Sequence, residues 1–152
     1  MKNRGYYKSK CDGIYAILIK TRAGWRCEET NTKVNLQCAH ILSRRFFATR
    51  WDFDNAICLS GGRHLYYTYH PVEWRKFIDE KFPGRYARLE QRALQLQKWS
   101  REELKQLYET LRDISDRGGG FDFSTLPKQA TKLIKRGGRN DSGHSDAGAG
   151  QD

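Results

Sequence analysis

Residues 38 to 64 read CAHILSRRFFATRWDFDNAICLSGGRH, which combines side chains able to move protons or bind metals with basic and aromatic residues. Just before this segment, Val34, Leu36 and Cys38 alternate with other residues, a pattern that predicts one face of a β-strand. Within the segment, His40, Asn55 and His64 follow one another at intervals of fifteen and nine positions. Because imidazole and amide groups can exchange protons or bind metals, these three residues are the first candidates for chemistry.

Helices are expected on both sides of this segment. Upstream, Asp12 can cap a helix that ends near Gly24, with the apolar positions Ile14, Tyr15, Leu18 and Ile19. Downstream, a helix is expected to begin at Pro71 and to end before Pro83-Gly84. A second downstream helix has the apolar positions Tyr86, Leu89, Ala93, Leu94 and Leu96. A third follows the capping box of Ser100 and Glu103, with the apolar positions Leu104, Leu107, Tyr108 and Leu111.

The chain of 152 residues has the length of one ordinary domain. Its 28 Lys and Arg against 18 Asp and Glu give a formal net charge of +10, which favours an acidic polymer such as a nucleic acid as partner. No apolar run approaches the roughly 18 residues needed to span a bilayer, and no secretory signal is visible. We therefore expect a cytoplasmic protein without a membrane partner, whose four cysteines are free thiols or metal ligands.

Composition divides the chain into two parts. Residues 1–115 carry the periodic apolar pattern of a folded domain, whereas residues 116–152 are rich in Gly and small polar residues, with a few basic ones. Such a segment cannot bury enough apolar surface to offset its ordering entropy, so a flexible, disordered tail is expected over 116–152.

Several short motifs in and after the central segment identify a family resemblance. They are Ala39-His40-Ile41, Ser43-Arg44-Arg45, Thr49-Arg50-Trp51-Asp52, Asn55-Ala56 and the run from His64 to Trp74. Together they resemble the HNH endonuclease family (His-Me finger, ββα-metal), most closely its small phage-type members, over roughly residues 12 to 93. The resemblance implies an α+β fold in which a small ββα-metal core is flanked by an N-terminal helix and C-terminal helices.

The resemblance also implies an activity, the metal-dependent hydrolysis of phosphodiester bonds in double-stranded DNA. His40 would end the first strand as the general base, and His64 would open the metal helix as a ligand. Asn55, in the connecting loop, would hold that loop, orient His40 or complete the metal shell. One divalent ion is implied, Mg²⁺ or Mn²⁺, with Ni²⁺, Co²⁺ or Zn²⁺ also compatible with an imidazole ligand.

The sequence departs from the family pattern in two places. Many members carry Asp or His directly before the general base as a second metal ligand, but here that position is Ala39. The missing ligand would then come from His70, Asn55, Cys38, or solvent and phosphate.

The second departure concerns a structural zinc knuckle of two Cys-x-x-Cys pairs that relatives often have. Here its positions read Cys27, Thr30, Ser60 and Arg63, so we expect no structural zinc. We expect Arg63 instead to pair with Glu28 or Glu29.

Arginines between His40 and Asn55 are candidates for DNA contacts. Arg44, Arg45 and Arg50 can clamp phosphates, because the forked guanidinium matches phosphate oxygens. For Arg50 the alternative is an ion pair with Asp52 or Asp54 that fixes the loop. We see no base-reading module, so weak sequence preference is expected.

The same sequence features also fit other functions. The main alternative is a catalytically weak or inactive HNH-fold protein that binds DNA or acts as an adaptor, and an RNA-directed activity is a further one. The family resemblance also implies a phage-encoded protein in the host cytoplasm, with phage packaging (terminase) proteins as partners of some relatives.

Overall fold

The sheet of this α+β protein has two antiparallel strands, β1 (Leu36–His40) and β2 (Ala56–Ser60). The fold is seen in a computed structural model that describes residues 1–134. In the register of the sheet, Leu36 pairs with Ser60 and His40 with Ala56. β2 runs directly into α2 (Gly61–Tyr69), because the Ser60 side chain accepts a hydrogen bond from the backbone N–H of Arg63 and caps the helix. The end of β1 and the start of α2 therefore belong to one small unit.

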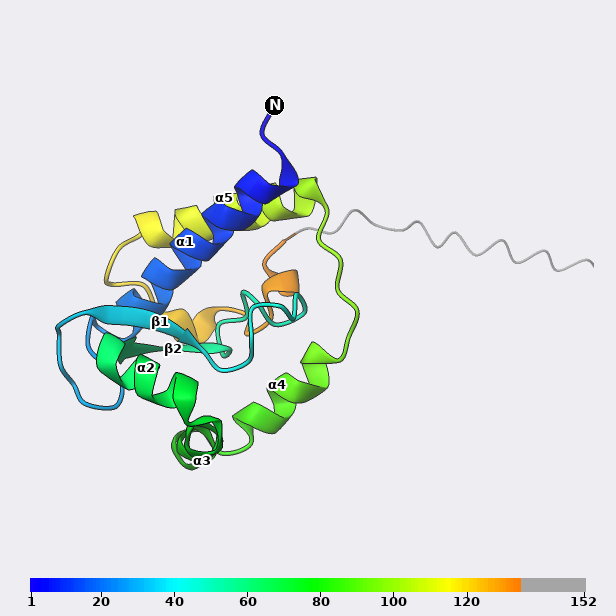
Figure 1. Cartoon of the computed structure of the whole chain (residues 1–152). Coiled ribbons are helices and arrows are strands. Elements are labelled where there is room, and N and C mark those ends of the chain that lie inside the picture. Colours follow the sequence, from blue (N-terminus) through cyan, green and yellow to red (C-terminus); the bar gives the residue numbers. More distant parts are fainter. Residues whose placement is uncertain (135–152) are drawn as a thin grey trace, which may run out of the picture.

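Helices cover both faces of this sheet (Figure 1). On one side, α1 (Arg4–Arg22) contacts both strands and packs along α5 (Arg101–Asp116). On the other side lies α2, followed by α3 (Pro71–Lys81) and α4 (Arg85–Ala93). The period of two in a strand explains the arrangement: Ala56 belongs to the core around α1, whereas Ile57 and Leu59 belong to the core around α2, α3 and α4.

Several sequence predictions for these helices are confirmed. α3 begins at Pro71, where the missing N–H of proline costs nothing. α5 begins with the predicted capping box, in which Ser100 and Glu103 satisfy each other's backbone N–H groups. The leucines of its apolar stripe, Leu104, Leu107 and Leu111, are all buried.

Other expectations for these elements are wrong. α1 begins at Arg4 rather than after Asp12, because the Asn3 side chain caps it by accepting from the N–H of Tyr6. Val34 lies outside β1 and is exposed. α4 ends at Ala93, so the predicted core positions Leu94 and Leu96 lie beyond it and are exposed.

The packed part of the chain also extends past residue 115. Two short 3-10 helices, η1 (Phe123–Thr125) and η2 (Ala130–Lys132), follow α5. Ala130 is buried in the core around α1, and so is Ile134. The boundary predicted at residue 116 is thus too early, because these apolar side chains return to the core. The remainder of the predicted tail, 135–152, lies outside the described residues.

None of the helices in the described part of the chain is both long enough and apolar enough to cross a membrane.

Candidate active site

An open cavity of about 740 Å³ lies between α1, the end of β1 and the start of α2. Its lining includes both His40 and His64, and both also line a second cavity of about 330 Å³. The strand ladder and the Ser60 cap place the two rings there, since one residue ends β1 and the other lies in the first turn of α2. The volume is within the range of about 300–1,000 Å³ that is usual for ligand-binding clefts.

His40 is held as a neutral imidazole of one tautomer. Its Nε2 lies 3.1 Å from the carbonyl oxygen of Arg50. Because a carbonyl only accepts, Nε2 carries the hydrogen and Nδ1 keeps its lone pair. Burial lowers the pKa of His40 to about 4, although the hydrogen bond to Arg50 acts against this. The ring is therefore uncharged at neutral pH, and Nδ1 can accept a proton.

His64 is held in the opposite tautomer. Its Nδ1 donates to Oε1 of Gln37 over 2.8 Å, so Nε2 keeps the lone pair. Burial lowers the pKa of His64 as well, which favours the neutral ring that a metal needs. At the start of α2, a Cβ at Gly61 would lie 2.2 Å from Nδ2 of Asn35 and 3.1 Å from Nε2 of Gln37. A side chain at position 61 would therefore crowd the amide groups of both residues.

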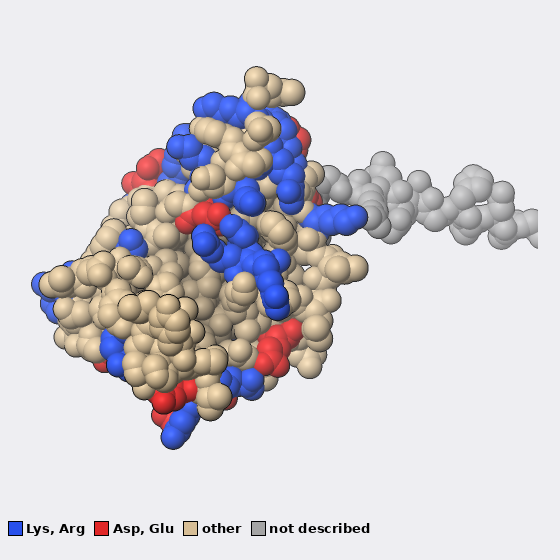
Figure 2. Space-filling view, in the orientation of Figure 1, with Lys and Arg blue, Asp and Glu red and all other residues tan. Residues whose placement is uncertain are grey.

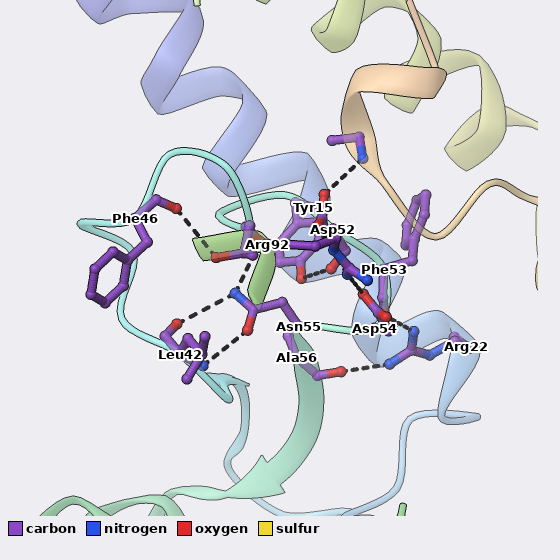
Figure 3. A network of polar contacts seen from close by, with 12 residues as sticks. Tyr15, Arg22, Leu42, Phe46, Asp52, Phe53, Asp54, Asn55, Ala56 and Arg92 are labelled. Atoms are coloured by element: carbon purple, nitrogen blue, oxygen red, sulfur yellow. Dashed lines mark hydrogen bonds and ion pairs between the residues drawn. The ribbon is translucent and has the colours of Figure 1, made fainter. Parts of the chain in front are cut away.

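Asn55 lies away from this chemistry, inside the loop of residues 41–55 (Figure 3). Its Oδ1 accepts from the N–H of Leu42 at 2.9 Å, and its Nδ2 donates to the carbonyl oxygens of Leu42 and Thr49. The residue is fully buried. Of the three roles predicted for Asn55, the structure favours holding the loop. The metal-ligand assignment is corrected, because the amide faces backbone groups rather than the cavity.

Asp52 connects the same loop to three other parts of the fold (Figure 3). Its carboxylate accepts from Arg92 of α4 and from the N–H of Ala130 in the C-terminal segment. Its backbone carbonyl accepts from the hydroxyl of Tyr15 in α1 at 2.6 Å. Arg92 also pairs with Asp54. The loop that follows His40 is therefore fixed from several sides.

Arg50 belongs to the scaffold and not to the predicted DNA-binding set. Its guanidinium donates twice to the carboxylate of Asp12, at 2.9 and 2.7 Å, and once to the carbonyl oxygen of Arg44 at 2.7 Å. The alternative role predicted for Arg50, an ion pair that fixes the loop, is confirmed. The predicted partners are wrong, because the carboxylate is that of Asp12 in α1 rather than Asp52 or Asp54. Trp51 Nε1 donates to the same carboxylate at 2.9 Å.

Arg44 and Arg45 are both exposed, as a phosphate-binding role requires. Arg44 lines the 740 Å³ cavity together with the two histidines, whereas Arg45 lies over the ring of Phe46, with its guanidinium carbon 4.8 Å from the ring centroid. On the face shown in Figure 2, Lys and Arg side chains gather near the middle, beside a smaller acidic group. Arg44 is thus the arginine of the predicted set with the most direct access to the histidines.

His70 does not line either of the cavities shared by His40 and His64. Its Nδ1 donates to the carbonyl oxygen of Tyr66 at 2.6 Å, and its ring stacks on the Tyr66 ring with centroids 4.1 Å apart. These contacts belong to the junction of α2 and α3. The structure thus does not bring the predicted third ligand to the other two histidines.

The positions of the expected zinc knuckle lie together but do not fit a zinc ion. Cys27 is the single thiol there, and the guanidinium of Arg63 pairs with Glu29 at 2.6 Å, which confirms the predicted ion pair. Burial favours the neutral thiol of Cys27, but hydrogen bonds from Thr30 and from neighbouring backbone groups lower its pKa to about 7. Tetrahedral structural zinc needs four N or S ligands, which these residues do not offer.

The cavity offers a divalent ion few protein ligands. Within residues 1–134, no group of three or more His, Cys, Asp or Glu side chains is arranged to hold a metal. Ala39 is buried, and its methyl group cannot coordinate. His64 Nε2 can supply one ligand, with water and substrate oxygens completing the shell. This donor set fits a weakly held catalytic ion and not a closed structural site.

Two residues of the cavity carry little signal in the sequence. Gln37 is an ordinary polar position on an exposed strand face, and only its contact with His64 marks it. Lys20 is one of 28 Lys and Arg residues and lies outside the motifs of the central segment. Their positions relative to the histidines depend on the packing of α1 and α2 against β1, which the spacing of residues does not reveal.

No protein-family model matches this chain, and neither a curated protein nor a solved structure matches it.

Proposed function

We propose that this protein is a divalent-metal-dependent endonuclease of the HNH type, which hydrolyses phosphodiester bonds of double-stranded DNA with little sequence specificity. The observation that carries the proposal is the pair of imidazoles in one cavity with opposite tautomers. His40 presents the lone pair of Nδ1 and His64 that of Nε2. A proton acceptor beside a metal ligand is what hydrolysis of an unreactive phosphodiester requires.

In the proposed reaction, Nδ1 of His40 takes the proton of a water molecule as the water oxygen attacks phosphorus. The bond from phosphorus to the 3′ oxygen breaks, and that oxygen leaves with a proton from solvent. The products would carry 5′-phosphate and 3′-hydroxyl ends, as the family resemblance implies. The hydrogen bond from Nε2 to the carbonyl of Arg50 stabilises the ring when it becomes charged.

His64 would hold the divalent ion through Nε2, with Gln37 fixing the orientation of the ring. When bound there, Mg²⁺ or Mn²⁺ supplies Lewis-acid stabilisation of the negative charge on the phosphate and leaving oxygens. The support for this assignment is the tautomer of His64 and its place in the cavity.

The test is nicking of supercoiled plasmid by wild type, His40→Ala and His70→Ala, each with EDTA, Mg²⁺ or Mn²⁺. We expect metal-dependent nicking by wild type and a loss of about 100-fold or more in His40→Ala, since this is the usual size of a general-base contribution. His70→Ala is the matched control, because it removes an imidazole outside the cavities and should nick like wild type. Equal nicking by wild type and His40→Ala would contradict the proposal.

A second candidate is a DNA-binding protein with little or no turnover, which the buried Ala39 favours because a ligand position of the family is lost. The same experiment separates the two functions when DNA binding is measured alongside. Binding without nicking in any of the metals would identify the second function. Nicking that disappears in His40→Ala, with binding retained, would identify the enzyme.

A further inference from the structure

We infer that Lys20 and Arg44 form a two-cation binding site for a phosphate of the DNA backbone, inside the cavity that holds His40 and His64. This inference rests on the proposed function and deepens it, because it names the residues that would hold the substrate. Lys20 lies in the last turn of α1, and Arg44 lies in the loop that follows β1. Folding brings both side chains to the lining of the 740 Å³ cavity.

The charges of both side chains act on a residue that lines this cavity. Burial raises the pKa of the Cys38 thiol to about 12, and the positive charges of Arg22, Lys20 and Arg44 act against that rise. The charge of Arg44 also acts on His40, in the same direction as burial. The charge of Arg44 therefore acts on both Cys38 and His40, which lie two positions apart in β1, and the charge of Lys20 acts on Cys38.

The cavity contains no free carboxylate to neutralise these cations. Asp12 is the acidic residue of the lining, and both of its oxygens are taken by Arg50 and Trp51. Among the ion pairs of residues 1–134, none includes Lys20 or Arg44. The cavity therefore presents uncompensated positive charge, which is suited to an anion.

The backbone that carries Arg44 is fixed in place. Nη1 of Arg50 donates to the backbone carbonyl of Arg44 at 2.7 Å, so the buried ion pair of Arg50 with Asp12 fixes the point from which the Arg44 side chain projects. Nζ of Lys20 lies 5.8 Å from the ring centroid of Trp25. A fixed attachment point lowers the conformational entropy that Arg44 loses when it binds a ligand.

The chemistry of the pair fits a phosphodiester. A guanidinium offers a planar fork of donors that matches two phosphate oxygens, and an ammonium adds a compact point charge. Such contacts bind the backbone without reading bases, consistent with the weak sequence preference proposed above. With a phosphate held by Lys20 and Arg44, the neighbouring imidazoles would lie beside the bond to be broken.

The inference is tested by titrating a short DNA duplex with protein in EDTA at several salt concentrations, so that binding is measured without turnover. One phosphate contact contributes about 0.9 to the steepness of log K against log salt. Because both cations hold the same phosphate, the double variant Lys20→Gln/Arg44→Gln should make this dependence less steep by about 0.9, and each single variant by about half of that. Each single variant should also weaken binding by about fivefold at low salt.

Lys10→Gln is the matched control, because Lys10 is on the same helix, carries the same charge and does not line the cavity. It should keep the wild-type slope, and so should Lys20→Arg, which also shows that position 20 tolerates substitution. A wild-type salt dependence in Lys20→Gln would overturn the proposed phosphate site of Lys20 and Arg44. An equally reduced salt dependence in Lys10→Gln would overturn it as well.

Plasmid nicking by the same proteins keeps the two proposals apart. If wild type nicks DNA but the salt dependence of binding is unchanged in the variants, the phosphate site is wrong and the nuclease proposal is retained. If the salt dependence becomes less steep as expected but no metal supports nicking, the phosphate site is retained and the nuclease proposal is wrong.

Discussion

The two irregular segments on either side of β1 are held in different ways. All buried polar or charged residues of the described chain fall in the loop of residues 41–55, at Thr49, Arg50, Asp52, Asp54 and Asn55. By contrast, the described non-glycine residues with positive φ all fall in the loop of residues 23–35, at Trp25, Asn31 and Asn35. The first loop is fixed by buried hydrogen bonds, and the second by local turns and one partly exposed ion pair, Glu29 with Arg63.

This difference matters because each loop makes contacts at or near one of the two histidines. The 41–55 loop accepts the Nε2 hydrogen of His40 through the carbonyl of Arg50. The 23–35 loop ends at Asn35, whose carbonyl accepts from the N–H of Gly61 at 2.7 Å, close to where Gln37 meets His64. Buried polar groups are costly to leave unpaired, so substitutions in the first loop should cost far more than those in the second.

The largest effect is expected from Asn55→Ala in the 41–55 loop. It removes the partners of the Leu42 N–H and the Thr49 carbonyl in a fully buried site, which should lower the free energy of unfolding by about 3–4 kcal/mol. Urea unfolding measures this loss. Asn31→Gly is the control from the 23–35 loop: Asn31 is exposed at a φ of 63°, which glycine adopts without strain, so little change is expected. Equal losses of unfolding free energy in the two variants would contradict the stronger fixing of the 41–55 loop.

Asp12→Asn should follow, with a loss of about 2–3 kcal/mol, because it leaves the buried guanidinium of Arg50 without its counter-charge. Asp79→Asn is the control, since Asp79 pairs with Arg75 on the exposed surface of α3 and should cost less than about 0.5 kcal/mol. The measurement is again urea unfolding of both variants. A small loss for Asp12→Asn would show that the buried pair does not brace the 41–55 loop.

The burial of His40 predicts a dependence of stability on pH. The unfolded residue takes up a proton near pH 6.5, whereas in the folded state burial lowers the pKa to about 4. Between these values the unfolded chain holds more protons, so the free energy of unfolding falls as the pH drops. Between about pH 7 and pH 5, His40→Gln should therefore lose about 2 kcal/mol less than wild type.

Asp52 acts in the opposite direction, since burial raises its pKa to about 6. Asp52 is present in both proteins, so its contribution cancels when the two are compared. Identical acid sensitivity of wild type and His40→Gln in urea unfolding would contradict the neutral, buried imidazole.

The smallest effect is expected at the 23–35 loop itself. Glu29→Gln removes the charge that pairs with Arg63, a partly exposed pair, and should cost about 1 kcal/mol. A double-mutant cycle with Arg63→Gln isolates this coupling in thermal unfolding. A chelator-resistant zinc in the purified wild-type protein would instead show that a metal braces this loop.

Local signals in the sequence account for a good part of the fold. Pro71 and the Ser100–Glu103 capping box mark the starts of α3 and α5, because each acts through groups within one helical turn. The start of α1 was missed, since Asn3 caps a helix whose first turns carry little apolar pattern. Leu94 and Leu96 continue a helical period although the helix has ended, so periodicity alone misplaced them.

The candidate site divides in the same way. The intervals between His40, Asn55 and His64 are enough to single these residues out. The partner of Arg50 is Asp12, 38 positions away, and that pairing exists only once α1 has packed against the 41–55 loop. Gln37 likewise meets His64 only once α2 has packed against β1. Contacts between distant segments are set by packing, which no local pattern records.

The most direct test of the two imidazole roles is the ¹⁵N–¹H NMR spectrum of the histidine rings near neutral pH, recorded as Mn²⁺ is added. We expect hydrogen on Nε2 of His40 and on Nδ1 of His64. We also expect Mn²⁺ to broaden the His64 signals first and those of His40 next, with His70 affected last. Hydrogen on Nε2 of His64, or broadening of His70 while His64 stays sharp, would contradict the division of roles between the two imidazoles.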